Sequence, residues 1–308
     1  MSEPRLAVTV GGGLVLKNPV LTASGTCGYG LELRPFMDPA RLGGIVVKGL
    51  SPRPRGGNAP VRIHETPSGM LNAIGLQNIG VEEFLRDRLP ELRRHDTAIV
   101  ANVFGETRED YDTVARALAG APGLAAVELN LSCPNTAEGG MLFGVVPRDV
   151  ERITRSVKAL VTVPVWVKLT PNVTDITEIA RAAEAGGADA LSLVNTFVGM
   201  AIDVRRRRPV LANGSGGLSG PAIRPLAVYL TWQVARAAKV PVIGMGGIVS
   251  GRDAVEFLLA GARAVQVGTA TFNDPAAAVR VVDEISDYCR EQKVADVNEL
   301  VGALEPAS

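Results

Sequence analysis

Aromatic residues make up only 4% of this 308-residue chain, whereas hydrophobic residues as a whole make up 46%. A core with this composition must be aliphatic and rich in alanine, which suits parallel strands that are buried on both faces. Lys and Arg together number 32, as do Asp and Glu, so the formal net charge is zero. The chain therefore has no overall field that would attract nucleic acid or an anionic membrane surface.

Cysteine and histidine are also scarce. The three cysteines are Cys27, Cys133 and Cys289, and no two of them form a CxxC pair. Three thiols cannot build a disulfide framework or supply the four thiolates of an iron–sulfur cluster. The two histidines, His64 and His95, belong to no HExxH or related motif. We therefore expect no metal site in this chain.

Long apolar runs are missing as well. No segment approaches the ~18 residues that a membrane-spanning helix requires. Residues 1–5 show no basic and apolar signal pattern. We therefore expect a reduced, cytoplasmic protein without a membrane segment.

Short aliphatic segments bounded by turn residues recur along the chain, as is typical of buried parallel strands. They are residues 20–23, 43–49, 98–104, 127–131, 163–169, 190–195, 240–247 and 264–269. Helical stripes lie between them, at Tyr111, Val114, Ala115 and Leu118, at 254–259, and at 176–183 after the N-cap candidates Thr174 and Asp175. Eight strands alternating with helices predict an α/β fold, a (β/α)8 TIM barrel formed by one domain over residues 1–308. A doubly wound open sheet is the alternative, but the glycine-rich stretches depart from the GxGxxG fingerprint.

Three connections appear as insertions that follow the C-terminal ends of strands: residues 50–80, 132–142 and 196–220. The first and third are rich in Gly, Pro and Asn, and loops of this length in a compact domain are usually functional or disordered. The run Arg205–Arg208 lies in the third insertion. It is most simply a solvated surface patch, and a docking patch for a protein partner is the alternative.

Cys133 lies in the hexapeptide Asn130-Leu-Ser-Cys-Pro-Asn135, directly after the fourth predicted strand. A thiol between two asparagines suits a reactive group in a polar pocket. A free cysteine is equally often a small buried hydrophobe. The hexapeptide alone leaves both interpretations open.

Polar residues or glycines follow the predicted strands, and the parallel strands of a barrel all end at one mouth. These residues are Ser24, Lys48, Asn102, Asn130 with Cys133, Lys168, Asn195 with Thr196, Gly246–Gly247 and Gly268–Thr269. The amides offer donors and acceptors in one plane, which suits a pyrimidine or an isoalloxazine ring. The lysines suit a carboxylate or an electron-rich ring, and the glycine-rich ends suit a phosphate. Cys133 is then the candidate thiol base.

Taken together, these segments resemble the dihydroorotate dehydrogenase family, in particular the cytoplasmic catalytic subunit of its NAD-dependent heteromeric (class 1B) type. The resemblance covers about residues 6–274. It rests on residues 18–25, 47–49, 69–78, 130–135, 167–172, 195–196, 216–220, 244–247 and 267–270.

The resemblance implies oxidation of (S)-dihydroorotate to orotate in pyrimidine (UMP) biosynthesis, with hydride transfer to N5 of FMN and Cys133 as the general base. It implies that FMN is bound by Ser24, Lys48, Gly49, Asn102, Asn130, Lys168, Val194, Gly220, Gly246, Gly247, Gly268 and Thr269. It implies that dihydroorotate or orotate is bound by Lys48, Asn72, Ala73, Ile74, Gly75, Leu76, Asn130, Asn195 and Thr196.

The resemblance also implies a partner: an electron-transfer subunit with FAD and a 2Fe-2S cluster that passes electrons to NAD. The catalytic chains would form a homodimer within a heterotetramer. The membrane-bound, quinone-using type carries an N-terminal helical extension and a serine base, and this chain has neither feature. One departure from the family pattern is Cys27, where an aromatic residue is expected. It leaves the packing beneath the flavin open.

Four rival functions remain at this stage. The nearest are a self-sufficient, fumarate-dependent dihydroorotate dehydrogenase and a dihydropyrimidine dehydrogenase-like subunit. A Schiff-base aldolase that uses Lys168 as its nucleophile represents another enzyme class. A flavin-binding scaffold subunit represents a non-enzymatic class.

Overall fold

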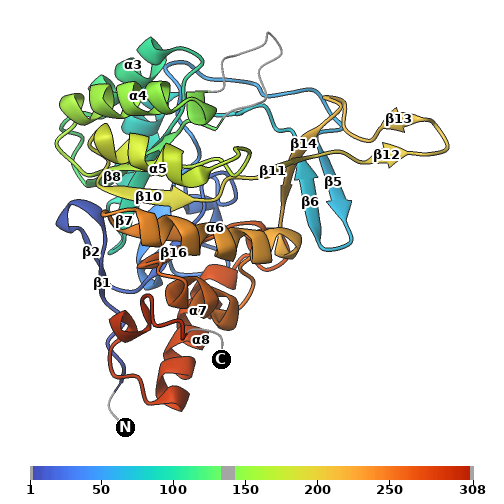
Figure 1. The fold of residues 1–308 in the computed structure, drawn as a ribbon. Helices are drawn as coiled ribbons and strands as arrows, with labels where there is room; N and C mark the ends of the chain where they lie inside the picture. The colour runs from blue at the N-terminus through green and yellow to red at the C-terminus, as the bar shows by residue number, and fades with distance from the viewer. Residues whose placement is uncertain (1–2, 133–142, 306–308) are drawn as a thin grey trace.

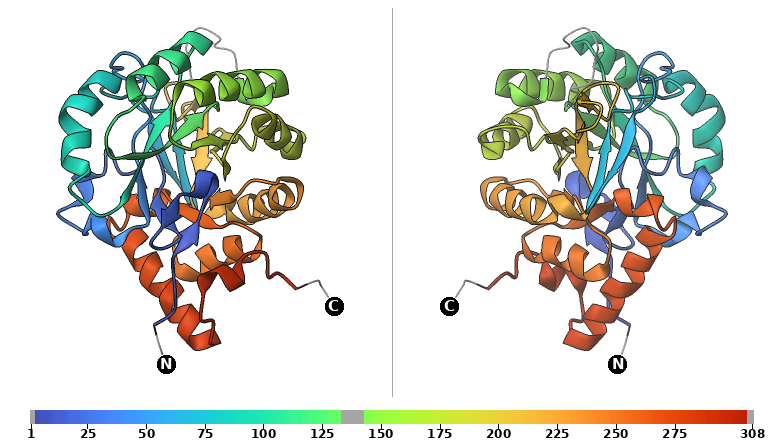
Figure 2. Two further views of the ribbon diagram at one scale, coloured as in Figure 1. Left: turned by 90° about the vertical axis from the view of Figure 1, so that its left-hand side faces the viewer. Right: turned by 90° about the vertical axis from the view of Figure 1, so that its right-hand side faces the viewer.

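The computed structural model describes residues 3–132 and 143–305, and within them eight parallel strands close into a barrel (Figures 1 and 2). The strands are β3 (Val20–Thr22), β4 (Gly44–Val46), β7 (Ala98–Val103), β8 (Leu124–Asn130), β9 (Val165–Lys168), β10 (Ala190–Leu193), β15 (Val242–Met245) and β16 (Ala264–Val267). The pairing of β16 with β3 closes the ring. These are the eight predicted segments, so the TIM-barrel prediction is confirmed and the open-sheet alternative is wrong.

Helices cover the outside of the barrel (Figure 2). They are α1 (Val81–Glu83), the π-helical turn η4 (Phe84–Arg88), α2 (Leu89–Leu92), α3 (Arg108–Leu118), α4 (Pro147–Leu160), α5 (Ile176–Ala185), α6 (Arg224–Ala237), α7 (Gly251–Leu259) and α8 (Ala277–Gln292). Short 3₁₀ turns add η2 (Leu31–Leu33), η3 (Pro39–Arg41), η5 (Phe143–Val145), η6 (Pro221–Ile223), η7 (Thr269–Phe272) and η8 (Val297–Leu300). No helix among these described residues is long and apolar enough to cross a membrane.

The helix ends follow from local side-chain chemistry. Thr107 forms a capping box with Asp110 at the start of α3, and Ser250 forms one with Asp253 at the start of α7. Each box satisfies backbone N–H groups that the first helical turn leaves unpaired. Asp175, rather than Thr174, caps α5, because its carboxylate accepts a hydrogen bond from Thr177 N. The predicted α3 stripe at Tyr111, Val114, Ala115 and Leu118 is buried against the barrel, as expected.

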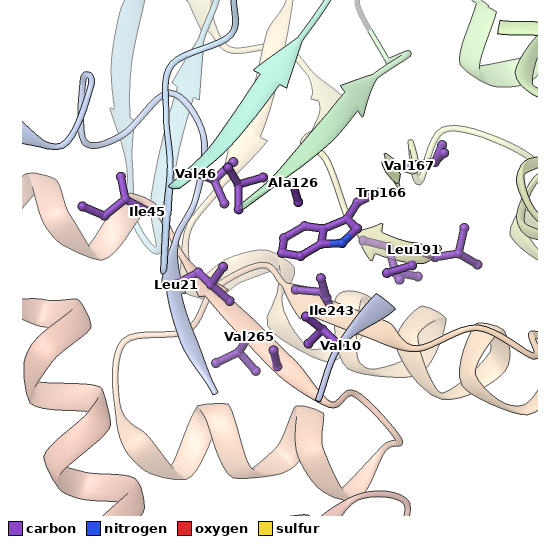
Figure 3. Close-up of a cluster of buried hydrophobic side chains, with 14 of the residues drawn as sticks. Val10, Leu21, Ile45, Val46, Ala126, Trp166, Val167, Leu191, Ile243 and Val265 are labelled. Atoms are coloured by element: carbon purple, nitrogen blue, oxygen red, sulfur yellow. The ribbon is translucent and has the colours of Figure 1, made fainter. Parts of the chain in front are cut away.

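Away from the mouth, the barrel interior is filled by an aliphatic core that surrounds one large side chain, the indole of Trp166 (Figure 3). Val10 packs beside it from a short antiparallel ribbon of β1 (Val8–Thr9) and β2 (Val15–Leu16), joined by the turn η1 (Gly11–Gly13). A Cβ on Gly11 would lie 2.1 Å from the carbonyl oxygen of Asp189. Only glycine therefore lets this ribbon lie so close to the start of β10, where it closes the end of the barrel opposite the mouth.

The two long insertions do not remain loops. They pair into an antiparallel sheet of β11 (Phe197–Gly199), β14 (Gly216–Ser219), β6 (Gly69–Asn72) and β5 (Ile63–Thr66), in that order, at the C-terminal end of the barrel (Figure 1). Beyond it, β12 (Ile202–Asp203) and β13 (Arg208–Pro209) form a projecting ribbon that carries the exposed run Arg205–Arg208. The sheet places side chains from both insertions beside the strand ends.

Candidate active site

The C-terminal strand ends and the second sheet enclose a cavity of about 360 Å³. Ser24 and Lys48 enter it from the segments after β3 and β4, Lys168 from the end of β9, and Asn72 from β6. Cavities of this size are typical of small-molecule and cofactor sites. The described charged side chains that line it are Lys48, Arg62 and Lys168, all cationic. The cavity is therefore suited to anionic ligands.

Most of the residues predicted for the site line this cavity. They are Ser24, Lys48, Asn72, Ile74, Gly75, Leu76, Lys168, Val194, Asn195, Thr196, Gly220, Gly246, Gly247, Gly268 and Thr269. Four predicted residues do not belong to its lining: Gly49, Ala73, Asn102 and Asn130. Cys133 and the rest of the segment 133–142 lie outside the described residues.

Two of these four residues, Asn130 and Asn102, lie next to the lining and contact residues at or near the strand ends. Asn130 Oδ1 accepts a hydrogen bond of 3.2 Å from Asn195 Nδ2, and its backbone oxygen accepts one of 2.9 Å from the Tyr111 hydroxyl. These bonds fix the end of β8 relative to the segment after β10. Asn102 is fully buried below the mouth, and a Cβ on Gly49 would lie only 2.9 Å from its Oδ1.

The two lysines are held in surroundings that disfavour their charge. Burial lowers the pKa of Lys48, and the positive charges of Lys168 and Arg62 lower it further. Burial also lowers the pKa of Lys168, and the negative charge of Glu128 offsets part of that effect. An anionic ligand between such cations would stabilise their protonated forms. The cavity thus gains electrostatically from binding an anion.

Glycines form one end of the cavity. Gly220 has φ +95° and Gly247 has φ +79°, a backbone region that other residues rarely adopt. A Cβ on Gly247 would lie 2.8 Å from Gly220 O, and one on Gly220 would lie 2.6 Å from the Cα of Gly69. The backbone is consequently bare here, and Thr269 Oγ1 and Ser219 Oγ join in a 2.9 Å hydrogen bond nearby. Backbone N–H groups that no side chain covers, together with two nearby hydroxyl groups, suit the binding of a phosphate.

Amides and tight turns form another part of the lining. Asn72 Nδ2 donates to Gly217 O at 3.3 Å, which ties β6 to β14. The adjoining segment turns sharply, with φ +75° at Gly75 and φ +58° at the non-glycine residue Leu76. Backbone strain of this kind is often found where a chain wraps a ligand.

Sequence analysis missed a polar cluster inside the barrel, directly below the cavity. Glu128 on β8 is fully buried, and its carboxylate accepts hydrogen bonds from Asn102 Nδ2 (2.8 Å), Ser192 Oγ (2.8 Å) and Gln266 Nε2 (2.7 Å). Gln266 also lines the cavity. The signal was a lone acidic residue within the apolar strand Ala-Ala-Val-Glu-Leu, where a charge is tolerated only if it is paired.

Cys27 is a core residue and does not line the cavity. Its side chain is 2% exposed, and its thiol donates to Thr22 Oγ1 at 3.2 Å and to Val46 O at 3.5 Å. Burial raises the pKa of this thiol to about 11. Cys27 thus closes a hydrogen-bonded contact between β3 and β4.

A (β/α)8 barrel whose mouth combines cations, amides and a glycine-lined end defines the general class of the protein: a barrel of the kind that binds its ligands at the strand C-termini. The model of the family described as dihydroorotate dehydrogenase matches residues 5–288. The chain belongs to the dihydroorotate dehydrogenase family, which confirms the resemblance drawn from the sequence.

Curated relatives share the full length of the chain. A protein of Citrifermentans bemidjiense is 52% identical over 305 residues, covering 99% of this chain and 100% of the relative. One of Desulforudis audaxviator is 55% identical over 291 residues, or 94% of this chain and 95% of the relative. One of Trichlorobacter lovleyi is 53% identical over 303 residues, or 98% and 99%. All three are named "Dihydroorotate dehydrogenase B (NAD(+)), catalytic subunit".

Proposed function

We propose that this chain oxidises (S)-dihydroorotate to orotate as the catalytic subunit of an NAD-linked enzyme of pyrimidine biosynthesis, with FMN bound in the barrel mouth. The observation that carries the proposal is the cavity lined by Lys48, Arg62 and Lys168 without an acidic side chain among its described residues. Both FMN, through its phosphate, and dihydroorotate, through its carboxylate, are anions. The names of the relatives agree with this assignment.

The described residues fit a flavin. The isoalloxazine ring carries an N–H donor beside its carbonyl groups, a pattern that suits the amide side chains in the cavity lining, those of Asn72, Asn195 and Gln266. A Cβ at Gly220 or Gly247 would meet other protein atoms within 3 Å, so only glycine lets this bare backbone, which suits a phosphate, form part of the cavity lining. When bound, FMN supplies the acceptor for the substrate hydride.

The chain's own residues bind the substrate and move its proton. Lys48 pairs with the carboxylate of dihydroorotate, while the Asn72 and Asn195 amides bond the ring carbonyl and N–H groups. Lys168 places a positive charge beside the ring that gains electrons. Cys133 takes the proton from C5 as the hydride leaves C6. A thiol serves as base near neutral pH only if its pKa is lowered, and Lys48 and Lys168 are the candidate positive charges for that effect.

The electrons leave through a partner. We propose an electron-transfer subunit that carries FAD and a 2Fe-2S cluster, with a dimer of this chain at the centre of a heterotetramer. The words "catalytic subunit" and "NAD(+)" in the relatives' names support a separate partner and this acceptor. The three cysteines of the chain are too few for the four thiolates of a cluster.

The visible spectrum of the purified chain tests the function. Oxidised flavin absorbance should be present and should bleach when dihydroorotate is added without oxygen. Flavin that stays oxidised under dihydroorotate would refute the catalytic role. Addition of NAD or fumarate to the reduced chain then separates the types. Neither should reoxidise it rapidly, and rapid reoxidation by fumarate would favour the self-sufficient type.

A further inference from the structure

The segment that follows β15 runs from the glycine-lined end of the cavity to the start of α7. Gly246 and Gly247 line the cavity, and Ser250 is the N-cap of α7. The Asp253 carboxylate accepts hydrogen bonds of 2.9 Å from the backbone N–H groups of both Val249 and Ser250. Asp253 is only 5% exposed. A buried carboxylate therefore holds the segment that carries this part of the cavity lining.

Asp253 brings a negative charge close to the glycine-lined end. Two residues of chain span at most about 7 Å, and the hydrogen bond from Val249 N adds 2.9 Å, so the carboxylate lies within about 10 Å of Gly247. The two backbone N–H groups and the N-terminus of α7 stabilise this charge. A carboxylate without a compensating cation at this distance would repel a bound phosphate.

Arg224, the first residue of α6, supplies the compensating charge. Its Nη1 pairs with Asp253 Oδ1, and its Nε lies 3.3 Å from Glu256 Oε2. Its Cβ is also close to the glycine-lined end, because a Cβ on Gly247 would lie 2.8 Å from it. Arg224 does not belong to the cavity lining itself. Its charge therefore acts on the carboxylate that holds the segment, rather than as part of the cavity wall.

The next N–H group of the segment has the same arrangement. Gly251 N donates to Glu284 Oε2, and the Glu284 carboxylate pairs with Arg280 at 2.9 Å. Arg280 Nη1 also donates to Val249 O at 3.2 Å. Both carboxylates that hold the backbone after β15 are thus matched by an arginine. Such pairing lets a carboxylate orient backbone N–H groups without leaving an unbalanced negative charge beside an anion site.

We propose that Arg224 is a positioning residue for the phosphate of the flavin: it cancels the charge of Asp253, so that this carboxylate shapes the glycine-lined end without repelling the phosphate. The inference rests on the proposed binding of FMN. It gives Arg224, which touches no part of the cavity lining with its guanidinium, a role in cofactor affinity that acts through Asp253.

The test compares FMN with riboflavin, which is the same flavin without the phosphate. In Arg224→Gln, Asp253 keeps its charge and loses its cation. At an effective dielectric constant of about 20, a unit charge about 10 Å from another changes a binding constant by about tenfold. We therefore expect the dissociation constant for FMN, measured by fluorescence quenching of the apoprotein at low salt, to rise about tenfold, while that for riboflavin stays nearly unchanged. A purely structural role would weaken the binding of both flavins equally.

The double variant Arg224→Gln/Asp253→Asn separates the charge of Asp253 from a direct contact between Arg224 and the phosphate. The asparagine keeps a carbonyl oxygen for the N–H groups of the segment and removes the negative charge, so most of the lost FMN affinity should return. If Arg224 bound the phosphate directly, the double variant would bind FMN as weakly as Arg224→Gln does. That result would overturn the inference.

Lys158→Gln is the matched control. It also removes one cation, which is paired with Asp189, and the Asp189 carboxylate likewise accepts a hydrogen bond from a backbone N–H group, that of Val165 at 2.7 Å. This pair lies at the N-terminal ends of β9 and β10, opposite the mouth. Lys158→Gln should therefore leave the affinities for FMN and riboflavin unchanged, and an equal loss of FMN affinity there would contradict a local effect of Arg224.

Asp253→Asn supplies a second route if Arg224→Gln does not fold, as judged by circular dichroism. It removes the negative charge and leaves the arginine, so the preference for FMN over riboflavin should rise. The same preference in the wild type and in the folded single variants would overturn the inference. A wild-type chain that binds neither flavin would instead overturn the proposed function.

Discussion

Replacing Gly247 with alanine should disable the glycine-lined end of the cavity. The new Cβ would lie 2.8 Å from Gly220 O and 2.8 Å from the Arg224 Cβ, well inside ordinary contact distance. The backbone there has φ +79°, which costs an L-residue about 1–2 kcal/mol. Relief of the crowding must move the backbone of the cavity wall, since one of the two atoms is a carbonyl oxygen.

Gly214 provides a matched control for this change. It has nearly the same backbone conformation, φ +81°, and a Cβ there would meet nothing within 4 Å. Gly214→Ala therefore carries the conformational cost alone, about 1–2 kcal/mol. Gly247→Ala carries that cost together with the crowding at the cavity.

Two measurements separate the effects. The thermal midpoint of the apoprotein should fall by a few degrees in Gly214→Ala, since about 1 kcal/mol corresponds to roughly 2 °C in a chain of this size. It should fall further in Gly247→Ala. The dissociation constant for FMN, measured by fluorescence quenching, should rise at least about tenfold in Gly247→Ala, or ~1.4 kcal/mol, and stay unchanged in Gly214→Ala. Equal FMN affinity in the two variants would refute the assignment of this end to the phosphate.

Three further outcomes are expected. Cys133→Ala should retain bound flavin while dihydroorotate turnover falls by two or more orders of magnitude, as for loss of a general base; near-normal turnover removes Cys133 from the mechanism. Orotate affinity should fall as pH rises through the pKa of Lys48, because the lysine then loses its charge; since that pKa is lowered, the fall should begin below the ordinary lysine value of about 10.4. In Lys48→Arg the fall should move to higher pH. If the fall stays at the same pH in this variant, a group other than Lys48 causes it. Mass spectrometry after treatment with a thiol reagent near neutral pH should find Cys27 and Cys289 unlabelled until the chain is unfolded, because both are buried and burial raises the pKa of each thiol; rapid labelling of Cys27 in the native chain would contradict its place in the core.

The sequence predicts the barrel because a parallel strand that is buried on both faces has a clear sequence pattern, a short aliphatic run between turn residues. It also places Lys48, Lys168 and Asn195 together, since parallel strands of a closed barrel can end only at one mouth. Family resemblance adds residues such as Asn72, which lie on no barrel strand. These strands and strand-end residues can be predicted because their signal lies in a short stretch of sequence or follows from the topology of a closed barrel.

Two features escape that reasoning. The second sheet forms only when β6 pairs with β14, and the hydrogen bond from Asn72 to Gly217 spans 145 positions of sequence. Nothing local in either glycine-rich insertion reveals such a partner. The Glu128 cluster is hidden for a different reason: its donors Asn102, Ser192 and Gln266 lie within strands, and their common direction depends on barrel closure.

The β6–β14 pairing has a consequence for how this mouth can change over evolution or by design. One wall is made from two insertions that follow different barrel strands and meet in register, Gly217 opposite Asn72 and Ser219 opposite Met70. Swapping either insertion alone from a relative would leave a strand edge without its complement. Substrate preference in this barrel should therefore be inherited in paired blocks, with residues 50–80 and 196–220 exchanged together or not at all.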